Sequence, residues 1–164
     1  MENYIDMKQR QQAEIDAFPF GCAFNEWQYK VMMEGWGLDP ETDKDKIARV
    51  FSGTFVKKSD LETFKEMMSR HDEELRAAIN ADKTGKGWAY EAIKYELANH
   101  EYCYSGEDAP VLAALGVKRS DLDADVELLE TFNLAIRDYM CETSRAEDAL
   151  YEQKLAKQKE VGDD

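Results

Sequence analysis

The stretch NHEYCYSG brings a histidine, a glutamate and a cysteine close together, which is the composition of a metal site or a nucleophilic site. In the zinc motif H-E-x-x-H, two imidazoles one helical turn apart hold the ion and the glutamate polarises a water. Tyr104 stands where the second histidine is required, so the sequence excludes that motif. A different zinc site stays open, with His71, His100 and Cys103 as ligands, if the two helices that carry them pack together.

Both histidines also have a plainer interpretation. A histidine on the apolar face of a helix is usually a neutral ring that is hydrogen-bonded to a carbonyl or a carboxylate. A nucleophilic pair of Cys103 with a histidine is the other chemical alternative, but aromatic and acidic surroundings disfavour the reactive thiolate. The sequence therefore predicts a protein that is not an enzyme and holds no cofactor. The alternative is a metal- or thiol-dependent enzyme centred on His100, Cys103 and His71.

The run DLDADVELLE, residues 121–130, has five carboxylates in ten residues and no base among them. Its first three acids match the start of an EF-hand loop, but Val126 and Phe132 stand where the loop needs glycine and glutamate. Acids at the start of a helix are favoured by the helix dipole. As a functional alternative, acids of this run and of the helix after it form a surface for a basic protein partner: Asp121, Asp123, Asp125, Glu127, Glu130, Asp138 and Glu142.

The charge of the whole chain supports an acidic surface. The 164 residues include 35 acids and 21 bases, which gives a net charge of -14. The excess is spread over both halves of the chain, and such a surface repels nucleic acid. The sequence therefore predicts no direct binding of nucleic acid, although solubility alone also accounts for an acidic surface.

The cysteines and the N-terminus indicate the compartment. Three cysteines, widely spaced and without a C-x-x-C pair, argue against an oxidised scaffold. The N-terminal residues lack the apolar core of a signal peptide, and no apolar run is long enough to span a membrane. We expect a protein of the reducing cytoplasm that does not contact the membrane, and its oligomeric state stays open.

Apolar residues at helical spacing define the elements that position these side chains. A hairpin is predicted around Ser52-Gly53 in KIARVFSGTFVKK, and Ser59 with Glu62 has the form of a capping box. The fold class is mostly α (α+β), with about five helices packed around a central aromatic helix and one small β-hairpin. Residues 1–150 form a single compact domain in this prediction, and residues 151–164 form a fraying or projecting tail. The predicted helices cover residues 4–18, 26–36, 59–78, 87–104, 109–115 and 119–161.

Three stretches carry a resemblance to a known family. They are FPFGCAFNEWQYK (18–30), SDLETFKEMMSRHDEEL (59–75) and YELANHEYCYSGEDAPVLAALG (95–116). They resemble a family of small acidic proteins of unknown function that occurs in Firmicutes genomes, phages and integrative elements. The resemblance covers most of the chain and implies a genomic setting without an activity.

The genomic setting and the charge together lead to a functional prediction. We expect a non-enzymatic, acidic protein-binding inhibitor or accessory protein of a phage or mobile element. It would mimic nucleic acid and block a host nucleic-acid-handling or defence protein, in the manner of anti-CRISPR or antirestriction proteins. The alternative is a structural or regulatory protein-interaction subunit whose exposed aromatic residues, such as Trp27 and Trp36, dock on another protein.

Overall fold

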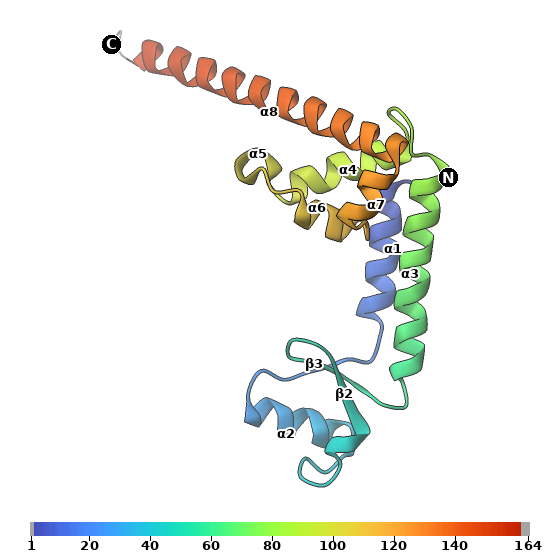
Figure 1. Cartoon of the computed structure of the whole chain (residues 1–164). Coiled ribbons are helices and arrows are strands. Elements are labelled where there is room, and N and C mark those ends of the chain that lie inside the picture. The colour runs from blue at the N-terminus through green and yellow to red at the C-terminus, as the bar shows by residue number, and fades with distance from the viewer. Residues whose placement is uncertain (1, 162–164) are drawn as a thin grey trace. The chain divides into compact units, whose positions relative to one another are not determined.

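The computed structural model describes the backbone of residues 2–161 and the side chains of residues 2–154. This part of the chain has eight α-helices, one short 3-10 helix and a three-stranded antiparallel sheet (Figure 1). The predicted class, mostly α with a little β, is confirmed. The chain divides into two compact units, which we call the sheet unit (Asp6–Glu73) and the helical unit (Met1–Ile5 with Glu74–Asp164). This division does not test cooperative folding, so the single domain of residues 1–150 stays a prediction.

Two long helices contain the boundaries between the units. Helix α1 spans Tyr4–Asp16 and helix α3 spans Leu61–Ala81. The predicted apolar stripe of α3 is real, because Phe64, His71 and Ala78 on that stripe are buried. The helix begins two residues after the predicted capping serine, and the Ser59 hydroxyl donates a hydrogen bond of 2.9 Å to the neighbouring Asp60 carboxylate instead.

The sheet has the order β1-β3-β2 and is antiparallel throughout. Its strands are β1 (Gly21–Cys22), β2 (Ile47–Phe51) and β3 (Thr54–Lys57). The hairpin predicted around Ser52-Gly53 joins β2 to β3, and Gly53 has the positive φ of 72° that such a tight turn requires. The sequence missed the third strand, because two residues carry no alternating pattern.

Helix α2 (Glu26–Gly35) covers this small sheet. It begins at Asn25, whose side chain accepts a hydrogen bond of 2.9 Å from the Gln28 backbone N–H. A 3-10 helix, η1 (Lys44–Lys46), leads into β2. The buried residues between α2 and the sheet are Ala23, Met33, Ile47 and Phe55.

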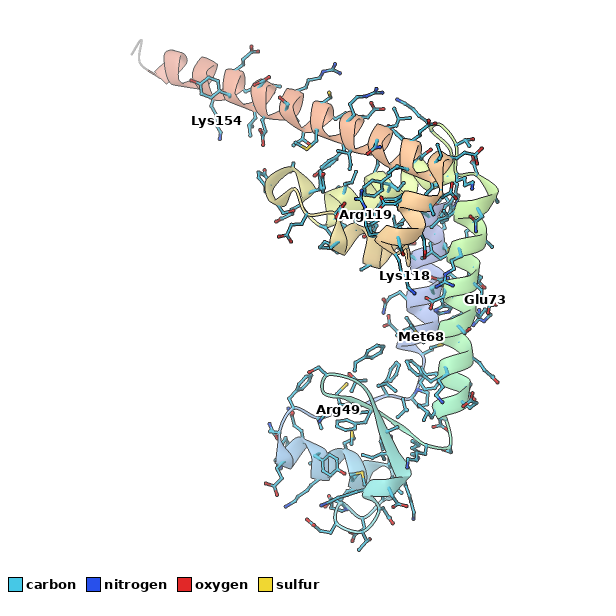
Figure 2. All side chains as sticks on the ribbon, viewed as in Figure 1. Arg49, Met68, Glu73, Lys118, Arg119 and Lys154 are labelled. Carbon is cyan, nitrogen blue, oxygen red and sulfur yellow. The ribbon has the colours of Figure 1, made fainter. Side chains whose placement is uncertain are left out.

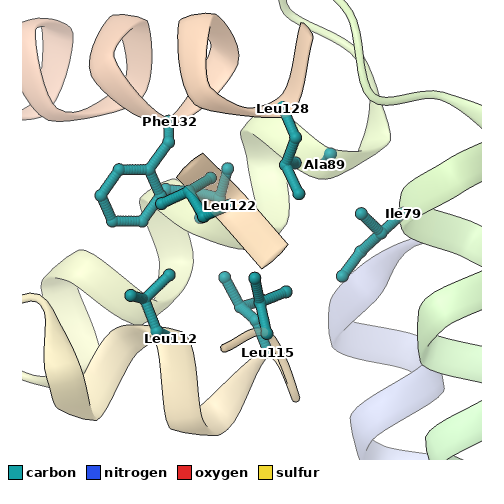
Figure 3. Close-up of a pocket in the computed structure, with 9 residues that line it drawn as sticks. Ile79, Ala89, Leu112, Leu115, Leu122, Leu128 and Phe132 are labelled. Atoms are coloured by element: carbon teal, nitrogen blue, oxygen red, sulfur yellow. The ribbon is translucent and has the colours of Figure 1, made fainter. Parts of the chain in front are cut away.

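The helical unit has a larger apolar core around α4 (Trp88–Asn99), which packs along α8 (Val126–Val161). The helices α5 (Tyr102–Ser105), α6 (Ala109–Ala114) and α7 (Arg119–Ala124) complete it. Figure 3 shows how side chains from α3, α4, α6, α7 and α8, together with Leu115 just after α6, converge on one point. The space left there is about 10 Å³, which is at the lower limit for one water, and its lining is entirely apolar. It is a filled core and not a ligand site.

Two predicted helices are interrupted. The helix over 87–104 ends at Asn99, because Glu101 takes a left-handed conformation with φ of 51° that no α-helix accommodates. The helix over 119–161 breaks at Asp125, whose backbone is extended and whose carboxylate accepts a hydrogen bond of 3.2 Å from the Leu128 N–H. Asp125 therefore acts as the N-cap of α8.

Helix α8 extends well past the region that packs on α4. Almost all described side chains from Cys141 to Lys154 are exposed. The predicted tail of residues 151–164 is helical as far as Val161, and its last three residues lie outside the described part. Among the residues described, no helix is both long enough and apolar enough to cross a membrane.

Candidate functional site

Most of the acids that we assigned to partner binding are engaged within the helical unit. Lys83 Nζ lies 2.7 Å from Asp125 Oδ2 and 3.5 Å from Glu127 Oε2. Arg119 Nε lies 2.9 Å from Asp123 Oδ1. The run of residues 121–130 contains no base, but bases outside the run neutralise three of its five acids.

The later acids of α8 are paired in the same way. Lys86 Nζ lies 2.8 Å from Asp138 Oδ2, and the Tyr90 hydroxyl donates to the same oxygen at 2.9 Å. Lys86, and after it Tyr90, lowers the pKa of Asp138 to about 2. Lys94 Nζ lies 2.8 Å from Glu142 Oε2. These pairs stabilise the packing of α4 and the turn before it against α8.

Two of the seven assigned acids stay available. Asp121 and Glu130 are exposed, and neither has an ion pair within the described residues. The other five, being paired, offer a partner less uncompensated charge than their number suggests. Partner binding by the seven acids stays a prediction.

His71 has the inward position that the sequence predicts. It is 5% exposed, and its Nε2 lies 3.0 Å from Glu14 Oε2, inside the sheet unit. The same carboxylate is bound by Arg70. Arg70, and after it His71, lowers the pKa of Glu14 to about 2. One ring nitrogen of His71 is therefore occupied by a carboxylate.

His100 and Cys103 lie near the end of α4. His100 is half-buried, and its Nε2 lies 3.4 Å from Glu96 Oε2 without hydrogen-bond geometry. The Cys103 Sγ accepts a hydrogen bond of 3.4 Å from the Tyr139 hydroxyl. The described part of the chain contains no group of three or more His, Cys, Asp or Glu residues arranged to hold a metal ion. The enzyme alternative stays untested.

Glu96 is a buried carboxylate that the sequence analysis did not single out. Its side chain is fully buried, and it accepts hydrogen bonds from the Tyr4 hydroxyl at 2.6 Å and from Asn99 Nδ2 at 3.1 Å. Burial, and then this hydrogen bond, raises the pKa of Tyr4. The sequence did contain a signal for its burial, because Glu96 lies one helical turn after Ala92 and Ile93, which are apolar and buried. Solvent does not reach this carboxylate, so its arrangement suits a structural role.

An open, largely apolar groove lies in the sheet unit, and we call it the aromatic groove. It has a volume of about 450 Å³. Phe24 is 74% exposed and Trp27 is 70% exposed, and Val31 is exposed as well. Trp27, Val31 and Gly35 recur every four residues, which places them on one face of α2. The groove is lined by Phe20, Gly21, Cys22, Phe24, Trp27, Gln28, Val31, Met32, Gly35 and Trp36.

The groove depends on a close approach of β1 to α2. A Cβ atom added at Gly21 would lie 2.5 Å from Met32 Sδ and 2.7 Å from the Trp36 ring, so only glycine fits there. Trp36 is half-buried and lies under Lys57, whose Nζ is 5.8 Å from the ring centroid. Of the two tryptophans that the sequence analysis named, Trp27 is thus the exposed one.

The comparisons with known proteins give a family and no activity. No curated protein and no solved structure matches the chain. The model of a family of unknown function, DUF7659, matches residues 3–138, which is most of the chain. The chain therefore belongs to the DUF7659 family of unknown function.

Proposed function

We propose that this protein is a non-enzymatic protein whose role is to bind another protein, and that the aromatic groove is its docking surface. The observation that carries the proposal is that Trp27 and Phe24 are both highly exposed and both line one groove. Clustered apolar surface of this kind marks an interaction site, whereas single exposed apolar residues are common. Tryptophan is also among the residues that most often dominate binding energy.

The groove is also held in place before any partner arrives. Its walls rest on the buried residues between α2 and the sheet, and Asn25 fixes the start of α2. The ring of Phe24 lies over the turn glycine Gly53, so close that an added Cβ would clash with it. A preorganised surface loses little conformational entropy on binding, which favours affinity.

The proposal also includes a biological setting and a class of target protein. The family resemblance and the net charge of -14 support an inhibitor or accessory protein of a phage or mobile element that acts in the bacterial cytoplasm. Its target in this proposal is a host nucleic-acid-handling or defence protein, of the kind that anti-CRISPR or antirestriction proteins block.

A second candidate binding mode is nucleic-acid mimicry by the helical unit. Its support is the surplus of 21 acids over 11 bases in that unit, and the unpaired, exposed Asp121 and Glu130. This mode requires a partner with a basic surface. Duplex DNA should compete with the protein for such a partner, and the competition should weaken as salt rises.

The experiment uses the full chain as bait in a lysate of the source organism, with quantitative mass spectrometry. Three baits are compared: the wild-type protein, Trp27→Ala, and the control Tyr104→Ala. Tyr104 is 77% exposed but lies outside the groove. We expect a protein that wild type and the control retain equally and that Trp27→Ala retains at least about tenfold less, as for a hot-spot residue.

Equal recovery of every protein by all three baits would contradict the groove proposal. If a captured protein is instead displaced by duplex DNA, and lost from Asp121→Asn/Glu130→Gln but not from Trp27→Ala, the second binding mode holds.

A further inference from the structure

The sheet unit gathers positive charge along the segment from η1 to the residue after β3. Residues 44–58, KDKIARVFSGTFVKK, contain five bases and one acid. Elsewhere the chain has 34 acids and 16 bases. The net charge of this segment is therefore opposite in sign to that of the rest of the chain. Figure 2 labels one of these bases, Arg49, in the sheet unit.

Three of the five bases have no acidic partner in the part of the chain that is described. Lys44 pairs with Glu41 and Lys46 with Asp43. Arg49, Lys57 and Lys58 make no ion pair. Arg49 lies over the Phe55 ring at 5.4 Å and Lys57 over the Trp36 ring at 5.8 Å. Such cation–π contacts orient a cation and leave its charge uncompensated.

Two of these free lysines line a hollow of about 370 Å³, which we call the basic hollow. Its one acid is Asp45, and its apolar wall is Leu38. The hollow thus presents a net positive charge next to an apolar surface. It is lined by Leu38, Asp45, Lys46, Lys57, Lys58 and Ser59.

The basic hollow adjoins the aromatic groove. Lys57 lines the hollow and lies over Trp36, which lines the groove. The Lys57 Nζ lies 5.8 Å from the centroid of the Trp36 ring. An extended peptide rises about 3.3 Å per residue, so residues close together in one bound peptide can contact both the Trp36 ring and Lys57. The two surfaces therefore suit one ligand with an apolar part and an anionic part.

We propose that the aromatic groove and the basic hollow together bind a linear segment of a partner protein that carries a large apolar side chain next to acidic residues. The apolar side chain packs in the groove that Trp27 and Trp36 line, and the carboxylates lie against Lys57 and Lys58. This inference rests on the proposed protein-binding function and adds the chemistry of the partner. Charge complementarity of this type sets the register and the specificity of binding.

Single-stranded nucleic acid also combines flat apolar rings with negative charge. The surroundings of the groove disfavour it. Glu34 is exposed next to Gly35 of the groove, Asp45 lines the hollow, and the sheet unit as a whole has 14 acids and 10 bases. A long polyanion would meet several of these acids along its length, whereas a short acidic segment in the hollow would meet one acid, Asp45, among three lysines.

The test is a selection from a random twelve-residue peptide library on the immobilised full chain. The affinity of the enriched peptides is then measured by fluorescence anisotropy. We expect enriched sequences with one aromatic or large aliphatic residue and at least two acids within about four positions. Lys57→Gln/Lys58→Gln should weaken binding about five- to tenfold, as for two exposed ion pairs, and added salt should weaken it too.

A matched control separates local charge from total charge. Lys44→Gln/Lys65→Gln removes the same charge from the sheet unit at two exposed positions outside the hollow. We expect this variant to bind within twofold of wild type. Circular dichroism confirms that each variant is folded.

Other outcomes would contradict the acidic-peptide inference, the groove proposal or both. Peptides without acidic enrichment that need Trp27 but not the two lysines would overturn this inference and leave the groove proposal intact. Failure to enrich any peptide, or binding that Trp27→Ala leaves unchanged, would overturn both. Tighter binding of a labelled single-stranded oligonucleotide, lost in Lys57→Gln/Lys58→Gln, would overturn the peptide as occupant. A mass in solution that halves in Trp27→Ala would assign the groove to a second copy of the chain.

Discussion

The two units differ in which of their surface side chains are already bonded within the protein and which are exposed to solvent. In the helical unit, acids that look available in the sequence are bonded to Lys83, Lys86 and Lys94 and serve to hold α8 in place. In the sheet unit, the large apolar side chains of Phe24 and Trp27 are exposed to solvent and line one groove. Five of the seven assigned acids are thus paired within their own unit, which makes the exposed aromatic residues of the sheet unit the better candidates for contact with a partner.

Exposed apolar residues exist in the helical unit as well. Tyr104 and Tyr151 are 77% and 65% exposed and lie on different helices. Isolated residues of this kind need no functional explanation. They provide the controls for the aromatic groove.

The largest expected effect contrasts a buried side chain with an exposed one. Leu122 is fully buried in the core of the helical unit, so Leu122→Ala should lower the free energy of unfolding by about 2 to 5 kcal/mol. Trp27→Ala should change it by less than about 0.5 kcal/mol. Urea denaturation measures both. A large loss for Trp27→Ala would mean that the ring packs within the protein and is not a free surface.

A smaller effect is expected at the buried carboxylate. Tyr4→Phe removes the hydroxyl that donates to Glu96 and leaves a buried acceptor without that donor. The free energy of unfolding should fall by about 1 to 3 kcal/mol. Tyr104→Phe, at an exposed position, is the control and should have no measurable effect in the same denaturation experiment. Equal behaviour of the two variants would show that the Tyr4 hydrogen bond contributes nothing.

The next prediction compares two acids of the same run. Asp125 caps α8 and pairs with Lys83, so Asp125→Ala should lower the free energy of unfolding by about 1 kcal/mol. Asp121 is exposed and unpaired, so Asp121→Ala should stay within about 0.5 kcal/mol. If both substitutions were neutral, the ion pairs would not hold α8, and the structural interpretation of the acids would be wrong.

The smallest effect concerns pH. Lys86 and Tyr90 hold the pKa of Asp138 at about 2 in the folded protein, below its ordinary value of 3.8. The unfolded chain therefore takes up the proton first, and this contribution to stability, complete above about pH 4, is lost as pH falls towards 2. Stability of wild type and Asp138→Asn, measured in urea from pH 6 to pH 2, should converge at the acidic end. A constant difference over that range would contradict the assigned pKa.

The helical framework was largely predictable from the sequence. Apolar spacing located α1, α2, α3 and α4, and Asn25 marked the start of α2, because these signals are local. The breaks at Glu101 and Asp125 were not predictable, since a helical pattern runs through both positions. The strand β1 was missed because its only signal is its pairing with β3, more than 30 residues away in the sequence.

The candidate sites depend on contacts that no local pattern contains. Lys83 meets Asp125 and Lys94 meets Glu142 across more than 40 residues, so the acids looked unpaired in the sequence. The aromatic groove needs Gly21 beside Met32, which only the folded chain reveals. The sequence did name Trp27 as a docking residue, and its exposure agrees with that alternative.

The central claim is that the aromatic groove, and not the acidic helices, makes the principal contact with a partner protein. The most direct test is the dissociation constant of the captured partner, measured by calorimetry for Trp27→Ala and for Asp121→Asn/Glu130→Gln. We expect Trp27→Ala to bind at least about tenfold more weakly than wild type, and the double amide variant to bind within about twofold of wild type. The reverse order of these two effects would contradict it.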